Sequence, residues 1–171
     1  MNETEWESRI AAAWESFDNY DEAGFLALIE KLAAERPADD GIGFFERGSS
    51  LDATGHPDMA IPLYEQALAA GLPEGRRRQA VIQLASSLRL AGRAEESAAL
   101  LTAEIEAPSG ERRDELSDEL VAFLALTLAD LGREREAASV ALAALAPHLS
   151  RYQVSVVNYA RQLVEPGGSP G

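Results

Sequence analysis

The 171-residue chain has no cysteine, which excludes disulfide bonds and any thiolate that could act in catalysis or hold a metal ion. Positive charge is also scarce. There are 15 Lys and Arg against 29 Asp and Glu, so the formal net charge is −14 and the pI is about 4.5. A surface of this sign repels phosphate backbones and anionic lipid headgroups. We therefore expect a protein that binds neither nucleic acid nor a membrane.

Long hydrophobic runs are missing as well. No apolar stretch approaches the ~20 residues that a membrane-spanning helix requires. The segment 1–5 is polar and acidic, unlike the start of a secretory signal. These features favour a soluble, cytoplasmic protein.

Motifs that carry chemistry are equally sparse. The chain has no Gly-rich phosphate loop and no serine in a nucleophile elbow. Its two histidines, His56 and His148, lack the histidine at i+4 or the nearby cysteine that a zinc site uses. We expect no catalytic residue, no metal and no cofactor. An enzyme or small-molecule binder is therefore the least supported interpretation.

Helical periodicity, by contrast, runs through most of the chain, and one pattern occurs three times. An apolar helical stripe leads to a glycine, and a second helix with small residues follows. The glycines Gly55, Gly92 and Gly132 are spaced by 37 and then 40 residues. This spacing is typical of stacked helical hairpins. We expect helices over 3–17, 21–36, 40–54, 57–70, 75–91, 94–106, 111–131, 134–146 and 150–164.

The repeated pattern resembles the tetratricopeptide repeat family. The residue types that this family places at six signature positions occur here at Phe44, Gly48, Gly55, Ala60, Tyr64 and Ala67. Later repeats depart from the pattern at Ser97 and Glu104, and Asp18 stands where the first repeat would have glycine. The segments 83–89, 123–126 and 151–160 are similar to the bacterial group-five tetratricopeptide repeat family, which implies a small helical scaffold without known enzymatic activity.

The resemblance implies an all-α fold: a right-handed superhelix of stacked antiparallel helix hairpins, with about four repeats and a C-terminal capping helix. We expect a single domain over 1–164. The tail 165–171, rich in Gly and Pro, is expected to be disordered.

In this family the first helix of each hairpin lines a concave groove. The positions that would face it are Phe45, Ser49, Asp52, Ile82, Ser86, Arg89, Ala122, Leu126 and Ala129. A small apolar groove of this kind suits a short helix or an extended peptide with apolar anchors. Arg89 would pair either with an acidic group of that partner or with an acid on a neighbouring helix. The resulting hypothesis is a non-catalytic protein-interaction scaffold.

The ends of the chain offer an alternative. Tyr152 and Tyr159 lie seven residues apart, so one helix face can carry both. That face would either seal the end of the stack by packing or form a homodimer contact through terminal helices. The aromatic residues of the N-terminal segment 6–20 have the same packing explanation, with an aromatic ligand site as the alternative.

The run Arg76-Arg77-Arg78 has two explanations. It would bind phosphate, or it would be solvated or paired with acidic residues on the helices around it. In so acidic a protein, the second explanation is favoured.

Overall fold

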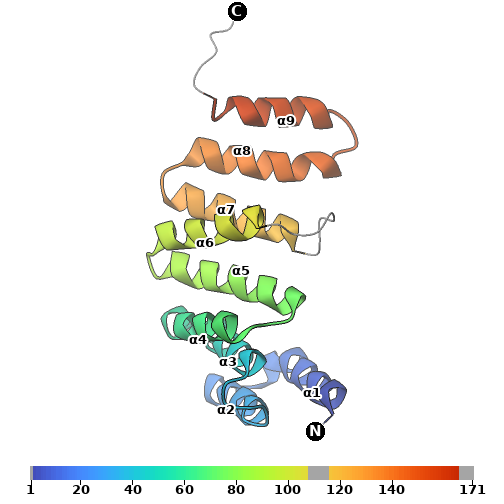
Figure 1. Cartoon of the computed structure of the whole chain (residues 1–171), viewed down its shortest axis with the longest axis vertical. Helices are drawn as coiled ribbons and strands as arrows, with labels where there is room; N and C mark the ends of the chain where they lie inside the picture. Colours follow the sequence, from blue (N-terminus) through green and yellow to red (C-terminus); the bar gives the residue numbers. More distant parts are fainter. Residues whose placement is uncertain (1, 108–115, 166–171) are drawn as a thin grey trace, which may run out of the picture. The chain divides into compact units, whose positions relative to one another are not determined.

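The computed structural model describes residues 2–107 and 116–165, and every regular element in these ranges is helical (Figure 1). The α-helices are α1 (Glu3–Glu15), α2 (Glu22–Ala33), α3 (Gly41–Ala53), α4 (Pro57–Ala70), α5 (Glu74–Leu90), α6 (Ala94–Glu106), α7 (Ser117–Asp130), α8 (Glu134–Leu145) and α9 (Gln153–Gln162). Two 3-10 turns cover Phe17–Asn19 and Ala146–His148. The predicted all-α fold and its helices are confirmed. The start of the helix predicted over 111–131 lies outside the described residues.

The chain groups into two compact units, Met1–Ser87 and Leu88–Gly171, and the boundary falls inside α5. The single domain predicted over 1–164 stays a prediction. The tail predicted over 165–171 lies, apart from Glu165, outside the described residues.

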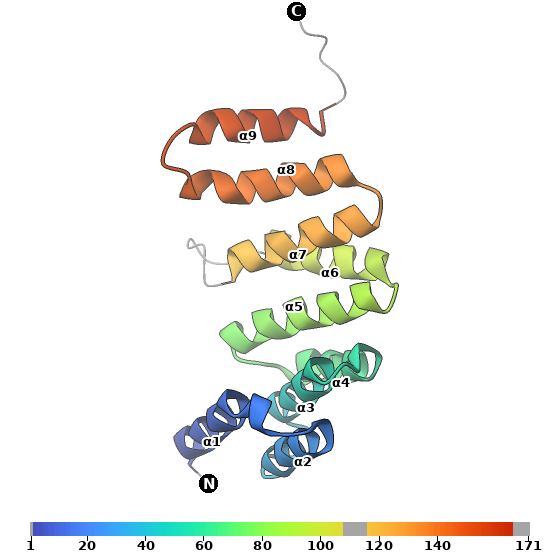
Figure 2. The ribbon, with the colours of Figure 1, turned by 180° about the vertical axis from the view of Figure 1, so that it is seen from behind.

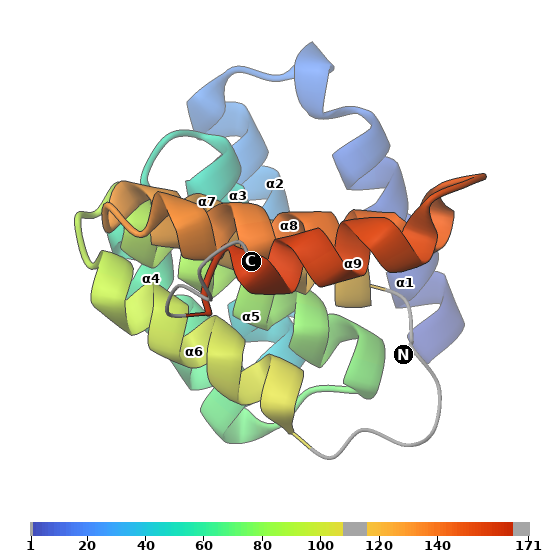
Figure 3. The ribbon, with the colours of Figure 1, turned by 90° about the horizontal axis from the view of Figure 1, so that it is seen from above.

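In the first unit, neighbouring helices pack in chain order, α1 on α2, α2 on α3 and α3 on α4. Figure 3 shows α1 and α2 side by side, joined at one end through the 3-10 turn. Helices α3 and α4 pack closely where Gly48 faces the fully buried ring of Tyr64. A Cβ on Gly48 would lie 3.1 Å from that ring, a contact so tight that a larger side chain would require the ring to move.

In the second unit, α6 packs on α7, α7 on α8 and α8 on α9. Figures 1 and 2 show α7, α8 and α9 as successive layers. Ser97, which departs from the family pattern, is fully buried with its hydroxyl 3.1 Å from that of Thr127. Since Thr127 Oγ1 donates to the Phe123 carbonyl, it is Ser97 that donates to Thr127. The departure therefore adds a buried hydrogen bond between α6 and α7.

Three helix corners share one backbone geometry, at Gly55, Gly92 and Gly132. Each glycine has a positive φ, between 71° and 90°, a region that other residues adopt at a cost. The next residue has φ between −115° and −101° and ψ between 49° and 57°. Its N–H donates to the carbonyl five residues earlier, at 2.8 to 2.9 Å. This C-cap arrangement satisfies the last carbonyls of the helix and confirms the corners expected from the glycines.

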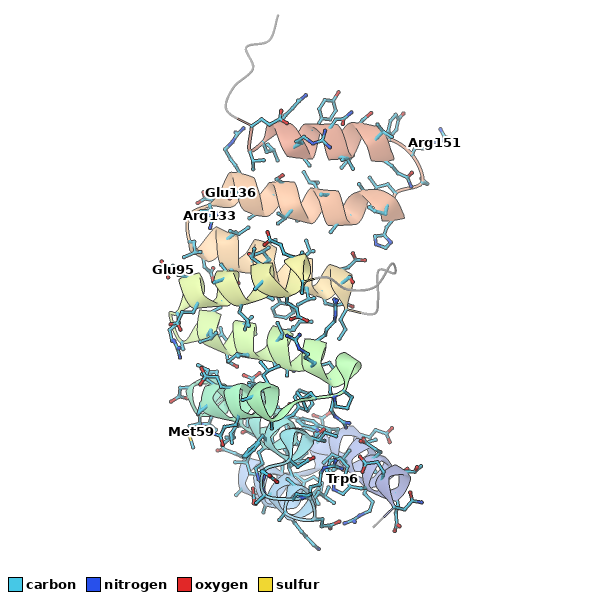
Figure 4. The ribbon with its side chains drawn as sticks, in the orientation of Figure 1. Trp6, Met59, Glu95, Arg133, Glu136 and Arg151 are labelled. Carbon is cyan, nitrogen blue, oxygen red and sulfur yellow. The ribbon has the colours of Figure 1, made fainter. Side chains whose placement is uncertain are left out.

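Two of these corners also share a surface contact. Arg93 follows Gly92 and pairs with Glu96 at 2.7 Å, and Arg133 follows Gly132 and pairs with Glu136 at 2.6 Å. Figure 4 shows the side chains of Arg133 and Glu136 next to each other. At these two corners the repeat extends from the backbone to the charged side chains.

Candidate functional site

The groove positions predicted in α3 are packed in the first unit. Phe45 and Ser49 are only 7% and 8% exposed. The Phe45 ring lies 6.2 Å from that of Tyr64, and the Tyr64 hydroxyl donates to Ser49 Oγ over 3.4 Å. Ile82, the equivalent of Phe45 in α5, is 8% exposed. These three side chains leave almost no surface for a partner.

The next predicted positions in this unit are half-buried, and one of them has a partner. Ser87 Oγ donates to the carboxylate of Asp52 over 3.2 Å, which ties α5 to α3. Burial raises the pKa of Asp52, and this hydrogen bond opposes the shift. Ser86, the predicted position directly before Ser87, is also half-buried. Asp52 is therefore engaged within the protein.

In the second unit, Arg89 lies 2.8 Å from Asp130 at the end of α7. The side chain of Arg89 is 22% exposed and that of Asp130 is 48% exposed. Of the two partners expected for Arg89, the structure shows the acid on a neighbouring helix. Both charges of the pair remain accessible to solvent.

The predicted positions in α7 are exposed. Ala122, Leu126 and Ala129 lie at i, i+4 and i+7, so they share one face of the helix. Leu126 is 50% exposed, and Leu90 at the end of α5 is 61% exposed. We call Ala122, Leu126 and Ala129 the α7 face. It presents apolar side chains to solvent, whereas Phe45 and Ser49, the α3 equivalents of Ala122 and Leu126, are buried.

A charge network around the buried Glu46 in the first unit was not anticipated from the sequence. Arg76 in α5 donates two hydrogen bonds to Glu7 in α1, at 2.8 and 2.7 Å, and lies 3.4 Å from Glu46 in α3. Trp14 Nε1 donates to the other Glu46 oxygen over 2.8 Å. The pairing expected for the arginine run is thus confirmed at Arg76. Glu7 and Trp14 both belong to α1, but all other pairs in the network are at least 30 positions apart in the sequence. No local pattern could therefore reveal the network.

The network shifts the pKa values of its two carboxyl groups in opposite directions. Glu46 is 3% exposed, and burial raises its pKa although Trp14 and Arg76 act against the shift. The hydrogen bonds from Arg76 lower the pKa of Glu7. The network joins α1, α3 and α5 and occupies the side of α3 that carries Glu46.

The aromatic residues divide between the two ends. Trp14 and Phe17 contact the buried Phe25 ring at centroid distances of 5.0 and 4.7 Å. Packing therefore explains the N-terminal cluster. The packing explanation is wrong for Tyr152 and Tyr159, which are 76% and 66% exposed.

The two histidines serve as partners of acids. His56 lies 2.6 Å from Glu22, and His148 lies 2.8 Å from Asp118. Within residues 2–107 and 116–165, no group of three or more His, Asp or Glu side chains is arranged to hold a metal ion.

Comparison with known proteins finds one match. A family model described as tetratrico peptide repeat matches residues 41–163, which is more than half of the chain. The chain belongs to the tetratricopeptide repeat family. Comparison with curated proteins and with solved structures finds no match.

Tetratricopeptide repeats generally mediate protein–protein interactions and are generally non-catalytic. The matched residues run from α3 to α9 and include every predicted groove position. The more specific assignment to the group-five family stays a prediction. No helix in the described part of the chain combines the length and the apolar character needed to cross a bilayer.

Proposed function

We propose that this tetratricopeptide repeat protein is a non-catalytic scaffold that binds a peptide or a partner helix through the α7 face. The observation that supports this is the difference in burial between equivalent repeat positions. Ser49 in α3 is 8% exposed, whereas its equivalent Leu126 in α7 is 50% exposed. A large apolar side chain stands in solvent at the position where the family's groove would be.

The surroundings of the α7 face suit a short amphipathic partner. The alanines on either side of Leu126 leave space for an apolar anchor from the partner. The Arg89–Asp130 pair at the end of α7 presents both signs of charge, so a polar group of the partner can fix its direction. Burying the exposed half of Leu126 would contribute about 1 kcal/mol.

The test compares two leucines of equal exposure. Leu126 is 50% exposed on α7, and Leu145 is 49% exposed at the end of α8. A peptide is first selected from a random displayed library on the wild-type protein. Its affinity is then measured by fluorescence anisotropy for wild type, Leu126→Glu and Leu145→Glu.

We expect Leu126→Glu to weaken binding by about tenfold or more, because it removes the apolar contact and desolvates a carboxylate. Leu145→Glu should stay within about twofold of wild type, since the α7 face is unchanged. Far-UV circular dichroism verifies that both variants are folded. Equal effects of the two substitutions, or no effect of Leu126→Glu, would refute the α7 face as the site.

A further inference from the structure

The three most exposed large apolar side chains of the described residues lie on α9 or at its start. Tyr152, Val154 and Tyr159 are 76%, 75% and 66% exposed. The opposite side of the helix packs on α8, where Ala160 is 1% exposed. Within the second unit, α9 packs on α8 and on the 3-10 turn before it. We call the exposed side, together with Arg151 and Arg161, the α9 face.

The α9 face also differs from the rest of the chain in charge. Residues 137–164 contain no Asp or Glu, although the whole chain carries 29 of them. Arg151 and Arg161 are both exposed, and Figure 4 shows Arg151 at the turn before α9. Tyrosine and arginine are enriched at the centre of protein interfaces, and Lys, Asp and Glu are depleted there; the exposed side of α9 also carries the polar residues Ser155, Asn158 and Gln162. The expected partner is an acidic surface with small residues.

Such a surface exists on α1 of the same sequence. Glu5, Ser8, Ala12 and Glu15 are exposed and share one side of the helix. Two small residues lie at its centre, with an acid on either side. The acids are ten residues apart, as are Arg151 and Arg161 on either side of the α9 face.

The ion pairs of the chain give independent support. Most arginines of the described residues are paired with acids, for example Arg9 with Glu35 and Arg89 with Asp130. Within the described ranges, neither Arg151 nor Arg161 forms an ion pair. In residues 2–107 and 116–165, Glu15 forms no ion pair either, and Glu5 forms none, although its charge also acts on Arg9 in the same helix.

We propose that the α9 face of one copy docks on the exposed side of α1 of a second copy, so that the chains associate head to tail. The tyrosine rings lie against Ser8 and Ala12, and the two arginines pair with Glu5 and Glu15. A symmetric dimer of two α9 faces is disfavoured, because it would place Arg151 and Arg161 of one copy next to the same arginines of the other. Residues 137–164 contain no Asp or Glu that could offset this repulsion.

The association is expected to be weak. One helix face against another buries less than the roughly 1,200 Å² at the lower end of stable interfaces. The net charge of −14 on each copy opposes approach as well. Sedimentation velocity over a series from micromolar to millimolar protein is therefore the suitable measurement.

The test uses one variant for each side of the contact. Tyr159→Ser removes the main ring of the α9 face. Glu15→Arg reverses one charge on α1, at a helix C-terminus where a cation is favourable. Met59→Ser is the control, since Met59 is 54% exposed and belongs to α4, which is neither of the two helices in the proposed contact. Far-UV circular dichroism and melting temperature verify folding.

We expect the sedimentation coefficient of wild type and of Met59→Ser to rise with concentration. Each of the other two variants should remain a monomer. Their equimolar mixture should form a species of two copies and nothing larger, because one intact α9 face meets one intact α1. Wild type that stays a monomer throughout would overturn the proposal, and this is also the result if α9 binds a different acidic protein. Dimers of Glu15→Arg alone would overturn it in favour of a symmetric contact.

Discussion

Replacing Gly48 by leucine should destabilise the first unit more than any surface substitution. A Cβ at this position lies 3.1 Å from two atoms of the Tyr64 ring and 3.4 Å from Leu63 Cβ. Tyr64 is fully buried and its hydroxyl is bonded to Ser49, so the ring cannot turn away. The added side chain forces α3 and α4 apart, at a cost of about 3 kcal/mol. In a chain of this size, that loss lowers Tm by about 6–12 °C.

The matched control lies in the same helix. A Cβ on Gly43 would have its nearest neighbours at 3.5 Å or more, which is ordinary contact. Gly43→Ala should therefore be neutral or stabilising by up to about 1 kcal/mol, because alanine favours the helix. Gly48→Ala should lose that gain to the contact with Tyr64. Urea unfolding followed by far-UV circular dichroism measures all three variants. Wild-type stability of Gly48→Leu would refute the packing that places α3 against α4.

Three further substitutions test single contacts by urea unfolding. Trp6→Phe should cost about 1 kcal/mol, because it removes the buried hydrogen bond from Trp6 Nε1 to the Leu32 carbonyl at 2.8 Å; no loss would contradict that bond. For Glu46, burial raises the pKa above the ordinary 4.5, so its contribution to wild-type stability falls as the pH rises above that value. Glu46→Gln should therefore gain stability relative to wild type over the same rise in pH, and a constant difference would exclude the raised pKa. Ser97→Ala should cost no more than about 1 kcal/mol, since Thr127 keeps its own hydrogen bond to the backbone; a larger loss would show a greater role for the Ser97 hydroxyl.

The helices and their corners could be predicted because their causes are local. The glycines Gly55, Gly92 and Gly132 end helices through a positive φ that each residue adopts by itself. Pro57 begins α4 at a position that needs no N–H. The apolar spacing of a helix likewise depends on residues within two turns. Such features can be inferred without knowing what each helix packs against.

The groove could be predicted only as a set of positions. Whether a position is open depends on packing between distant segments. Phe45 and Ser49 are buried against Tyr64, whereas Leu126 is half-exposed. Glu46 is another example, since its partners Trp14 and Arg76 are about 30 residues away on either side. No spacing along the chain encodes these contacts.

The proposed binding of a partner through the α7 face can be tested most directly by cross-linking. A peptide selected on the wild-type protein can be made with a photo-reactive group next to its apolar anchor, cross-linked and mapped by mass spectrometry. We expect the cross-links to fall on Ala122, Leu126 and Ala129. Cross-links concentrated on α3, at or beside the buried Phe45 and Ser49, would contradict it.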